Sequence, residues 1–211
     1  MIAAALLAAT LCAAPVAPVA PATRQLVTVE AATRTTTHAT VRLWRRAANG
    51  CWKPAGGPWP ARVGRNGVSS HHREGDGTTP LGTFRFGPVA YGIAPDPGVH
   101  FAYRRLVCGD WWDEDPSSPT YNRFRHVRCG RAPPFGGDSE ALWLATRAYR
   151  YFAVMRYNDD PVVPGRGSAM FVHADTGEAT NGCVSLPLPQ LVRVLRWLDP
   201  AARPVIAIRV R

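Results

Sequence analysis

Proline and glycine interrupt this sequence so often that short strands and turns are favoured over long helices. Twenty prolines and nineteen glycines are spread over 211 residues, and both residue types break helices and favour turns. The apolar fraction of 46% is normal for a globular protein, so the chain can bury a sizeable core. The sequence therefore predicts one domain built from many short strands.

Alternating or continuous apolar stretches predict eight or more strands. They include residues 26–29, 39–45, 61–63, 83–86, 99–107, 151–157, 168–172 and 204–210. Residues 23–37 are expected to be a linker that contains 26–29 as an edge strand, and residues 54–60 a turn-rich connector.

Two short helices are expected beside these strands. One starts at Asp138 or Ser139 and ends near Ala148, and the other covers residues 189–198, with apolar side chains on one face. The predicted fold class is mainly β: a single-domain β-sandwich or barrel with two short helices, over residues 38–211.

The first 22 residues predict an export signal. They carry no charged side chain, residues 2–14 form an apolar run, and residues 20–22 (A-P-A) resemble a cleavage site. The apolar run is too short to cross a bilayer, and prolines follow it. We therefore expect an exported protein, located in the cell wall or outside the cell, with no integral membrane span in the mature chain.

Export places the remaining cysteines, Cys51, Cys108, Cys129 and Cys183, in an oxidising compartment. Cys108 and Cys129 flank a loop-rich segment and are the expected disulfide pair. A catalytic thiol at Cys183 would have to stay free. Metal-binding proteins place cysteines at short spacing, such as C-x-x-C, and this sequence has no such pair. No metal and no organic cofactor are expected.

The net charge of +10 comes from 25 basic against 15 acidic residues, and all but one of the basic residues, Lys53, are arginines. Arginine enrichment is typical of GC-rich codon usage, or it indicates a polyanionic partner. The arginines are scattered, and no helix-turn-helix, zinc-finger or RNP motif accompanies them. We expect no nucleic acid partner; a cell-envelope polymer with carboxylates or phosphates fits the charge equally well.

The stretch from residue 168 to 187 holds the candidate chemistry. A buried strand ends on His173, and Cys183 follows ten residues later across a polar, glycine-bearing loop, which can bring an imidazole to a thiol. Gly182 permits a tight turn, so that nearby N–H groups can face an oxyanion. Asp175 or the carbonyl of Ala174 could orient the imidazole. Alternatively, both residues are structural, as buried cysteines and strand-end histidines often are.

Three other groups in the sequence have open roles. His71 and His72 could line a groove, although a solvated pair is the default interpretation. Trp111 and Trp112 could stack on a substrate or anchor the core. Residues 113–115 (D-E-D) could bind the positively charged amine of a substrate, although a solvated acidic run is the default.

Two motifs resemble the L,D-transpeptidase (YkuD-like) family. Residues 180–187 (T-N-G-C-V-S-L-P), after a strand that ends F-V-H, resemble the family's cysteine signature. Residues 76–84 (D-G-T-T-P-L-G-T-F) resemble its early proline–glycine segment. The resemblance covers about residues 60 to 211 and implies that Cys183 is the nucleophile and His173 its base.

The resemblance also implies roles for the neighbouring residues. Backbone N–H groups at Gly182 and the cysteine would form an oxyanion hole, and the carbonyl of Ala174 would orient the imidazole. Thr180 would shape the loop, and with Asn181 and Ser185 it is a candidate for substrate contact. The chain departs from the family pattern in its shorter His–Cys interval and in Ser185, which stands where asparagine or arginine is usual.

The function implied is an exported L,D-transpeptidase that acts as a monomer on peptidoglycan stem peptides. Cys183 would form a thioester with a donor stem, and an acceptor amine would resolve it into a cross-link. Two alternatives remain: a cell-wall cysteine hydrolase (an L,D-carboxypeptidase), and a non-catalytic peptidoglycan-binding protein.

Overall fold

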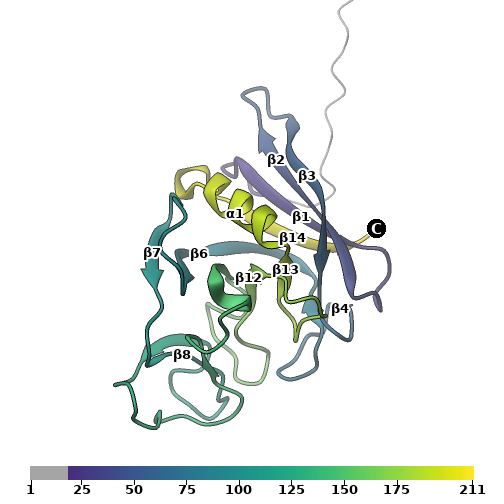
Figure 1. Cartoon of the computed structure of the whole chain (residues 1–211). Coiled ribbons are helices and arrows are strands. Elements are labelled where there is room, and N and C mark those ends of the chain that lie inside the picture. The colour runs from purple at the N-terminus through teal and green to yellow at the C-terminus, as the bar shows by residue number, and fades with distance from the viewer. Residues whose placement is uncertain (1–18) are drawn as a thin grey trace, which may run out of the picture.

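Within residues 19–211, which the computed structural model describes, eight strands of one sheet close into a barrel (Figure 1). The order around the barrel is β11-β12-β13-β3-β2-β1-β14-β6, and β6 pairs back with β11. The prediction of a mainly β, barrel-like fold is confirmed. These strands are β1 (Gln25–Ala31), β2 (His38–Arg46), β3 (Trp52–Arg62), β6 (Gly82–Gly92), β11 (Phe152–Met155), β12 (Phe171–Ala174), β13 (Val184–Leu186) and β14 (Val205–Val210).

Smaller elements surround the barrel. A second sheet has the order β10-β8-β9, and β7 pairs with β6 while β4 pairs with β5. No helix within residues 19–211 is long and apolar enough to cross a membrane. The elements are β4 (Val68–Ser69), β5 (Thr79–Pro80), β7 (Ala102–Arg105), β8 (Asp110–Asp113), β9 (Arg123–His126), β10 (Glu140–Ala141), α1 (Leu188–Trp197) and the 3₁₀ turns η1 (Ala148–Arg150) and η2 (Pro200–Ala202).

The predicted disulfide is present. Cys108 and Cys129 are joined, with their Cα atoms 5.2 Å apart. The bond ties the chain just before β8 to the chain just after β9, so it closes the base of the smaller sheet. The predicted export signal, residues 1–22, lies mostly outside the described residues and stays a prediction.

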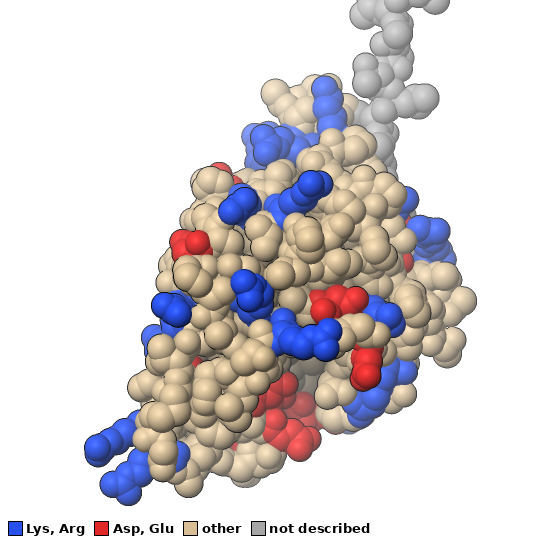
Figure 2. All heavy atoms as spheres, in the orientation of Figure 1, with Lys and Arg blue, Asp and Glu red and all other residues tan. Residues whose placement is uncertain are grey.

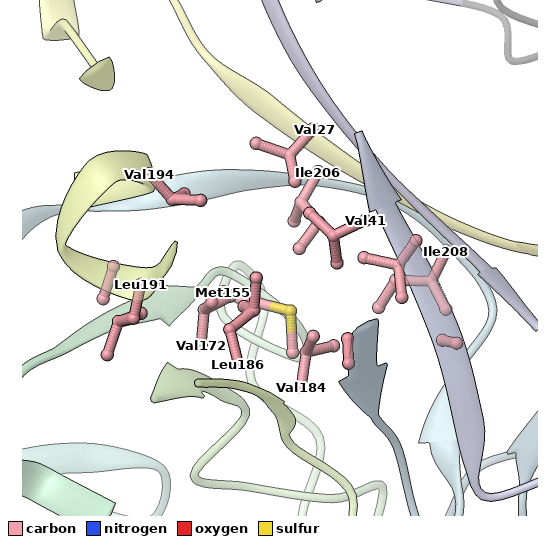
Figure 3. Close-up of a cluster of buried hydrophobic side chains, with 14 of the residues drawn as sticks. Val27, Val41, Met155, Val172, Val184, Leu186, Leu191, Val194, Ile206 and Ile208 are labelled. Atoms are coloured by element: carbon pink, nitrogen blue, oxygen red, sulfur yellow. The ribbon is translucent and has the colours of Figure 1, made fainter. Parts of the chain in front are cut away.

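The barrel interior is filled by branched apolar side chains (Figure 3). Alternate residues of each strand point inward, because successive side chains of a strand point to opposite faces. Helix α1 packs its own apolar face onto the same cluster, and the helix over residues 189–198 is therefore confirmed within one residue at each end. The inward side chains include Val27, Val41, Met155, Val172, Val184, Leu186, Ile206 and Ile208, and α1 adds Leu191, Val194 and Leu195.

The prediction of an edge strand within a linker is wrong. Strand β1 pairs with β14 on one side and with β2 on the other, so it is internal to the sheet. Val27 and Val29 face the barrel core, while Leu26 packs on the outer side with Trp52. A short apolar run covered on both faces is typical of a central strand, and residues 25–31 belong to the barrel.

The predicted connector at residues 54–60 is also strand. Strand β3 pairs with β2 along its length, but its pairing with β13 is confined to Arg62 opposite Ser185. The rest of its second edge makes no strand pairing among the described residues. Proline lacks an N–H group and is tolerated at such an edge, which explains how Pro54, Pro58 and Pro60 lie within β3.

The helix predicted from residue 138 to 148 does not form. Ser139 accepts a hydrogen bond from the Glu114 N–H at 3.0 Å instead of capping a helix, and Leu142 donates to Asp110 O at 3.0 Å. The segment becomes β10 followed by the η1 turn. Leu142 and Tyr149 are buried in a second apolar cluster outside the barrel. These apolar residues therefore pack against the rest of the fold without forming one face of a helix.

We predict that Leu191→Ala lowers the free energy of unfolding by about 2–5 kcal/mol, because a buried leucine that is truncated leaves a cavity. Leu191 is fully buried on α1. Leu144→Ala is the matched control, since Leu144 is 68% exposed, and its effect should stay within about 0.5 kcal/mol. Urea unfolding followed by circular dichroism measures both, and equal losses would contradict the packing described here.

Candidate active site

His173 and Cys183 lie on the outer face of two neighbouring barrel strands. Strands β12 and β13 run parallel, with Val172 opposite Val184, and both valines face the barrel core. Alternation then directs Phe171, His173 and Cys183 outward. Phe171 belongs to the outer apolar cluster, and Cys183 packs against that cluster. The strand register therefore brings the two candidate residues to one face.

The connection between these strands is unusually short. Parallel neighbours normally need about a dozen or more connecting residues, whereas residues 175–183 suffice here. Hydrogen bonds to the chain after β3 hold the loop: the Thr180 N–H donates to Val63 O at 3.0 Å, and the Arg65 N–H donates to Thr180 O at 2.7 Å. The short His–Cys interval thus forms a loop with defined backbone partners.

Two threonine hydroxyls meet at the carbonyl oxygen of Cys183. Thr180 Oγ1 donates to it at 2.7 Å and Thr79 Oγ1 at 3.2 Å. Thr79 also accepts a hydrogen bond from the Gly64 N–H at 2.8 Å and is fully buried. These contacts give a physical reason for the two sequence motifs to occur together, because a threonine of the first motif fixes the backbone of the second.

Gly182 is required by its backbone conformation. Its φ of +143° is one that L side chains rarely adopt, and an added Cβ would lie 2.9 Å from the carbonyl oxygen of Thr78. The Gly182 N–H donates to Thr180 Oγ1 at 3.2 Å. The amide of Gly182 is therefore engaged within the loop.

The thiol of Cys183 is bound to the backbone of the chain entering β12. Its Sγ donates to Ala169 O at 3.2 Å and accepts from the Phe171 N–H at 3.3 Å. Burial raises the pKa of the Cys183 thiol, and the charges of Glu140 and Glu114 raise it further, against the Phe171 hydrogen bond. The resting thiol is therefore un-ionised at neutral pH.

The imidazole of His173 is buried and oriented by its own strand. Nδ1 lies 2.9 Å from the carbonyl oxygen of Ala174, and the ring is 7% exposed and edge-on to Tyr149 at 5.8 Å between centroids. Burial lowers the pKa of His173. With Nδ1 donating to the carbonyl, Nε2 carries the lone pair. Within residues 19–211 no hydrogen bond joins this ring to the Cys183 thiol.

Cys183 opens onto an acidic cavity of about 480 Å³. Figure 2 shows Asp and Glu side chains gathered around a hollow in the face that it presents. Asn181 lines the cavity and accepts a hydrogen bond from the Arg65 guanidinium. His173, Thr180 and Ser185 are not among the lining residues. The cavity is lined by Arg65, His72, Glu74, Gly75, Glu114, Gly137, Asp138, Ser139, Glu140, Ser168, Ala169, Met170, Asn181 and Cys183.

Of the three candidates for substrate contact, Asn181 alone reaches this cavity among the described residues. Thr180 is 8% exposed and uses its hydroxyl within the loop. Ser185 is 1% exposed and lies opposite His173 in the strand register. Its Oγ is 3.5 Å from Asp175, whose carboxylate accepts from the Gly177 N–H at 2.9 Å. Asp175 thus holds the loop and also pairs with Arg62 of β3 at 3.5 Å, while the Ala174 carbonyl faces the imidazole.

Two default interpretations of the sequence are wrong. The acidic run at residues 113–115 is not a solvated face, because Asp113 is fully buried and Glu114 is 9% exposed. Of the histidine pair, His71 is exposed as expected, whereas His72 is 4% exposed, with Nδ1 2.9 Å from Asp76 and 3.1 Å from Thr78. Trp112 anchors the core, and its Nε1 donates to Asn122 at 3.0 Å.

Sequence reasoning missed Glu74, Glu140 and Tyr149 as site residues. The Tyr149 hydroxyl donates to Glu140, while its ring packs against His173. Glu140 fell within the helix predicted there and Tyr149 lies directly after its expected end, so the helix prediction hid their roles. Glu74 precedes the proline–glycine motif by a few residues, and its nearness to that motif is the signal that could have identified it.

The fold and site define a β-barrel protein with a free thiol beside a polar cavity. A family model described as the L,D-transpeptidase catalytic domain (YkuD) matches residues 32–206. The chain therefore belongs to this family, as the resemblance of its motifs predicted. Comparisons with curated proteins and with solved structures gave no match.

We predict that Thr79→Val lowers the free energy of unfolding by about 1–3 kcal/mol, because it leaves the buried Gly64 N–H without its acceptor. Thr33→Val is the control, since the Thr33 hydroxyl is exposed and bonds only to Thr35, and its effect should stay within about 0.5 kcal/mol. Thermal unfolding compares the two. Equal stability of the two variants would show that Thr79 does not fix the loop.

We also predict slow alkylation of Cys183 at neutral pH. Because burial raises the thiol pKa, the thiolate fraction should still be increasing above pH 9, where a free cysteine of pKa about 8.5 approaches its plateau. Mass spectrometry after timed exposure to iodoacetamide, from pH 6 to 10, gives the profile, with a short peptide that has one exposed cysteine and blocked ends as reference. A plateau at or below the pH at which that peptide reaches its own would contradict the prediction.

Proposed function

We propose that this chain is an L,D-transpeptidase that forms a thioester on Cys183 with a peptidoglycan stem peptide. The observation that carries the proposal is that Cys183, a free thiol, lines the polar cavity in a chain that matches the family over residues 32–206. The thiolate attacks the carbonyl carbon of an L-to-D peptide bond in the donor stem, and the D-amino acid leaves.

His173 is the base in this proposal. Its imidazole is neutral and has Nδ1 directed at the Ala174 carbonyl, so Nε2 carries the lone pair that would accept the thiol proton. Because the thiol is bound to Ala169 O at rest, the Cys183 side chain rotates toward the imidazole before the proton moves. The imidazolium then gives that proton to the leaving amine, while the Ala174 carbonyl stabilises its charge.

The oxyanion of the tetrahedral intermediate needs an N–H donor. The Gly182 N–H already donates to Thr180 Oγ1, so the Cys183 N–H is the better-placed donor of the two. Thr79 and Thr180 support this role indirectly, because both hydroxyls hold the Cys183 carbonyl and thereby orient the adjacent peptide.

We further propose that the protein is exported, acts in the cell wall and works as a monomer. The uncharged, apolar start of the sequence supports export. The Cys108–Cys129 disulfide fits the same compartment, because disulfides persist where the surroundings are oxidising.

A non-catalytic peptidoglycan-binding protein is the second candidate. The observation that favours it is the buried, un-ionised thiol, which bonds to the β12 chain and not to His173. An L,D-carboxypeptidase, in which water resolves the thioester, differs from the transpeptidase only in the final acceptor.

We predict that incubation with tetrapeptide muropeptides produces an acyl adduct on Cys183 and a cross-linked product. Cys183→Ala should abolish both, and His173→Gln should slow adduct formation by about 10²- to 10⁴-fold through loss of the base. Mass spectrometry of the intact protein and of the muropeptides provides the measurement.

His100→Gln is the control, because His100 is exposed and away from the cavity. Full turnover by the Cys183→Ala protein would refute the proposal. An adduct that yields only hydrolysed stem when an amine acceptor is present would identify the carboxypeptidase. Sedimentation with peptidoglycan without any adduct would identify the binding protein.

A further inference from the structure

A groove beside strands β6 and β14 collects arginine side chains. It has a volume of about 680 Å³, and Arg85, Arg156 and Arg203 line it. None of the described residues that line it is acidic. The groove shares no lining residue with the cavity beside Cys183. It is therefore a separate site, and its charge is positive where that of the thiol cavity is negative.

The three arginines come from separate segments that the barrel brings together. Arg85 lies on β6 between Phe84 and Phe86, which pack with the barrel core, so the alternation of the strand directs Arg85 outward. Arg156 directly follows β11, and its N–H donates to Arg85 O at 2.8 Å. Arg203 ends the η2 turn just before β14. The strand pairing thus gathers three guanidinium groups around one groove.

Two of these guanidinium groups lack an acidic partner. Among the ion pairs within residues 19–211, Arg156 pairs with Asp159, whereas Arg85 and Arg203 take part in none. A guanidinium group presents five N–H donors in a planar fork that matches a phosphate or a carboxylate. The groove therefore offers positive donors to an anion that the described part of the chain does not supply.

The other walls of the groove are mostly apolar. Nine of the fourteen lining residues are valine, alanine, phenylalanine or proline, so a wholly hydrophilic anion would leave most of the surface in contact with water. Phe101 is one of them, and its ring is only partly buried. Covering apolar surface is favourable. The lining therefore favours an amphiphile that has an anionic head and an apolar tail.

The chain enters the barrel at this groove. Val19, Ala20 and Ala22 line it, and they follow the apolar run of residues 2–14 in the sequence. An export signal is inserted in a lipid bilayer until it is cleaved, so the export proposed above brings the groove to a membrane surface. Cleavage after Ala22 would remove these three lining residues, leave all the arginines, and add the α-ammonium group of Thr23, which also lines the groove.

We propose that this groove binds an anionic membrane phospholipid. The guanidinium groups of Arg85, Arg156 and Arg203 hold the phosphate, and the apolar walls cover the first part of the acyl chains. The site acts independently of the Cys183 thiol and goes beyond the function proposed above. Its occupation would keep the barrel at the membrane surface after the export signal is removed, without any membrane-spanning segment.

Short-chain lipids that stay monomeric in water test the groove directly. Dihexanoyl-phosphatidylglycerol is titrated into the full chain below its critical micelle concentration and followed by the NMR amide signals of Thr83 and Val205, which line the groove. Dihexanoyl-phosphatidylcholine has the same tails without the net charge, and glycerol phosphate has the charge without the tails. We expect saturable shifts with the first compound and about tenfold weaker binding of each of the other two.

Arg85→Gln and Arg203→Gln should each weaken binding of the anionic lipid about tenfold, because each removes charge-assisted hydrogen bonds to the phosphate. Arg131→Gln also removes one positive charge, at an exposed position outside the groove, and should leave binding unchanged. Equal binding of phosphatidylcholine, or equal binding of glycerol phosphate, would overturn the proposal, since the first indicates an apolar site and the second a phosphate site. Unchanged affinity in both groove variants would overturn it as well.

Docking on a membrane has a separate readout. The full chain is sedimented with phosphatidylglycerol vesicles, and the combined Arg85→Gln and Arg203→Gln variant should be retained about tenfold less than the wild type. The combined Arg125→Gln and Arg131→Gln variant has the same net charge and the same leader, both substitutions are at exposed positions, and it should sediment like the wild type. Equal losses in the two variants would refute docking through the groove. Cys183→Ala should bind vesicles normally, so a failure of the thioester chemistry would not affect this result.

Discussion

The parallel pairing of β12 with β13 is the constraint on which the candidate site depends. It opposes Val172 to Val184, and the alternation of a strand then forces His173 and Cys183 out of the barrel onto one face. A shift of one residue would direct the thiol into the apolar core. The Thr79 hydroxyl opposes such a shift. It donates to the Cys183 carbonyl and accepts from the Gly64 N–H in the chain that follows β3.

The surroundings of Cys183 oppose ionisation of its thiol in the resting protein. Burial and neighbouring carboxylates favour the neutral sulfur, and burial also favours the neutral imidazole. Both groups of the pair are therefore uncharged in the resting protein. A buried, neutral thiol is also less readily oxidised than an exposed thiolate.

The sequence predicted the barrel, the helix of residues 189–198, the disulfide and the family, because each depends on local pattern or on short motifs. The prediction of residues 26–29 as an edge strand in a linker was wrong, because an apolar run of four does not show how many strands pair with it. The sequence also predicted a helix from residue 138 or 139 to about 148, where the packing of neighbouring Tyr149 against Phe171 and His173 overrides local spacing. The acidic cavity could not be predicted, because Glu74, Glu114 and Glu140 meet only through tertiary structure.

The barrel and the smaller sheet, which the Cys108–Cys129 disulfide closes, contribute different residues to the cavity and its surroundings. The barrel strands carry the thiol and the imidazole, whereas β8, β10 and their flanking loops carry Glu114 and Glu140. The segment between β7 and β11 is thus an exchangeable face of the cavity. Replacing its side chains would leave the strand register that positions the thiol intact, but it would also change the thiol pKa, which Glu140 and Glu114 raise, and the packing of Tyr149 against His173.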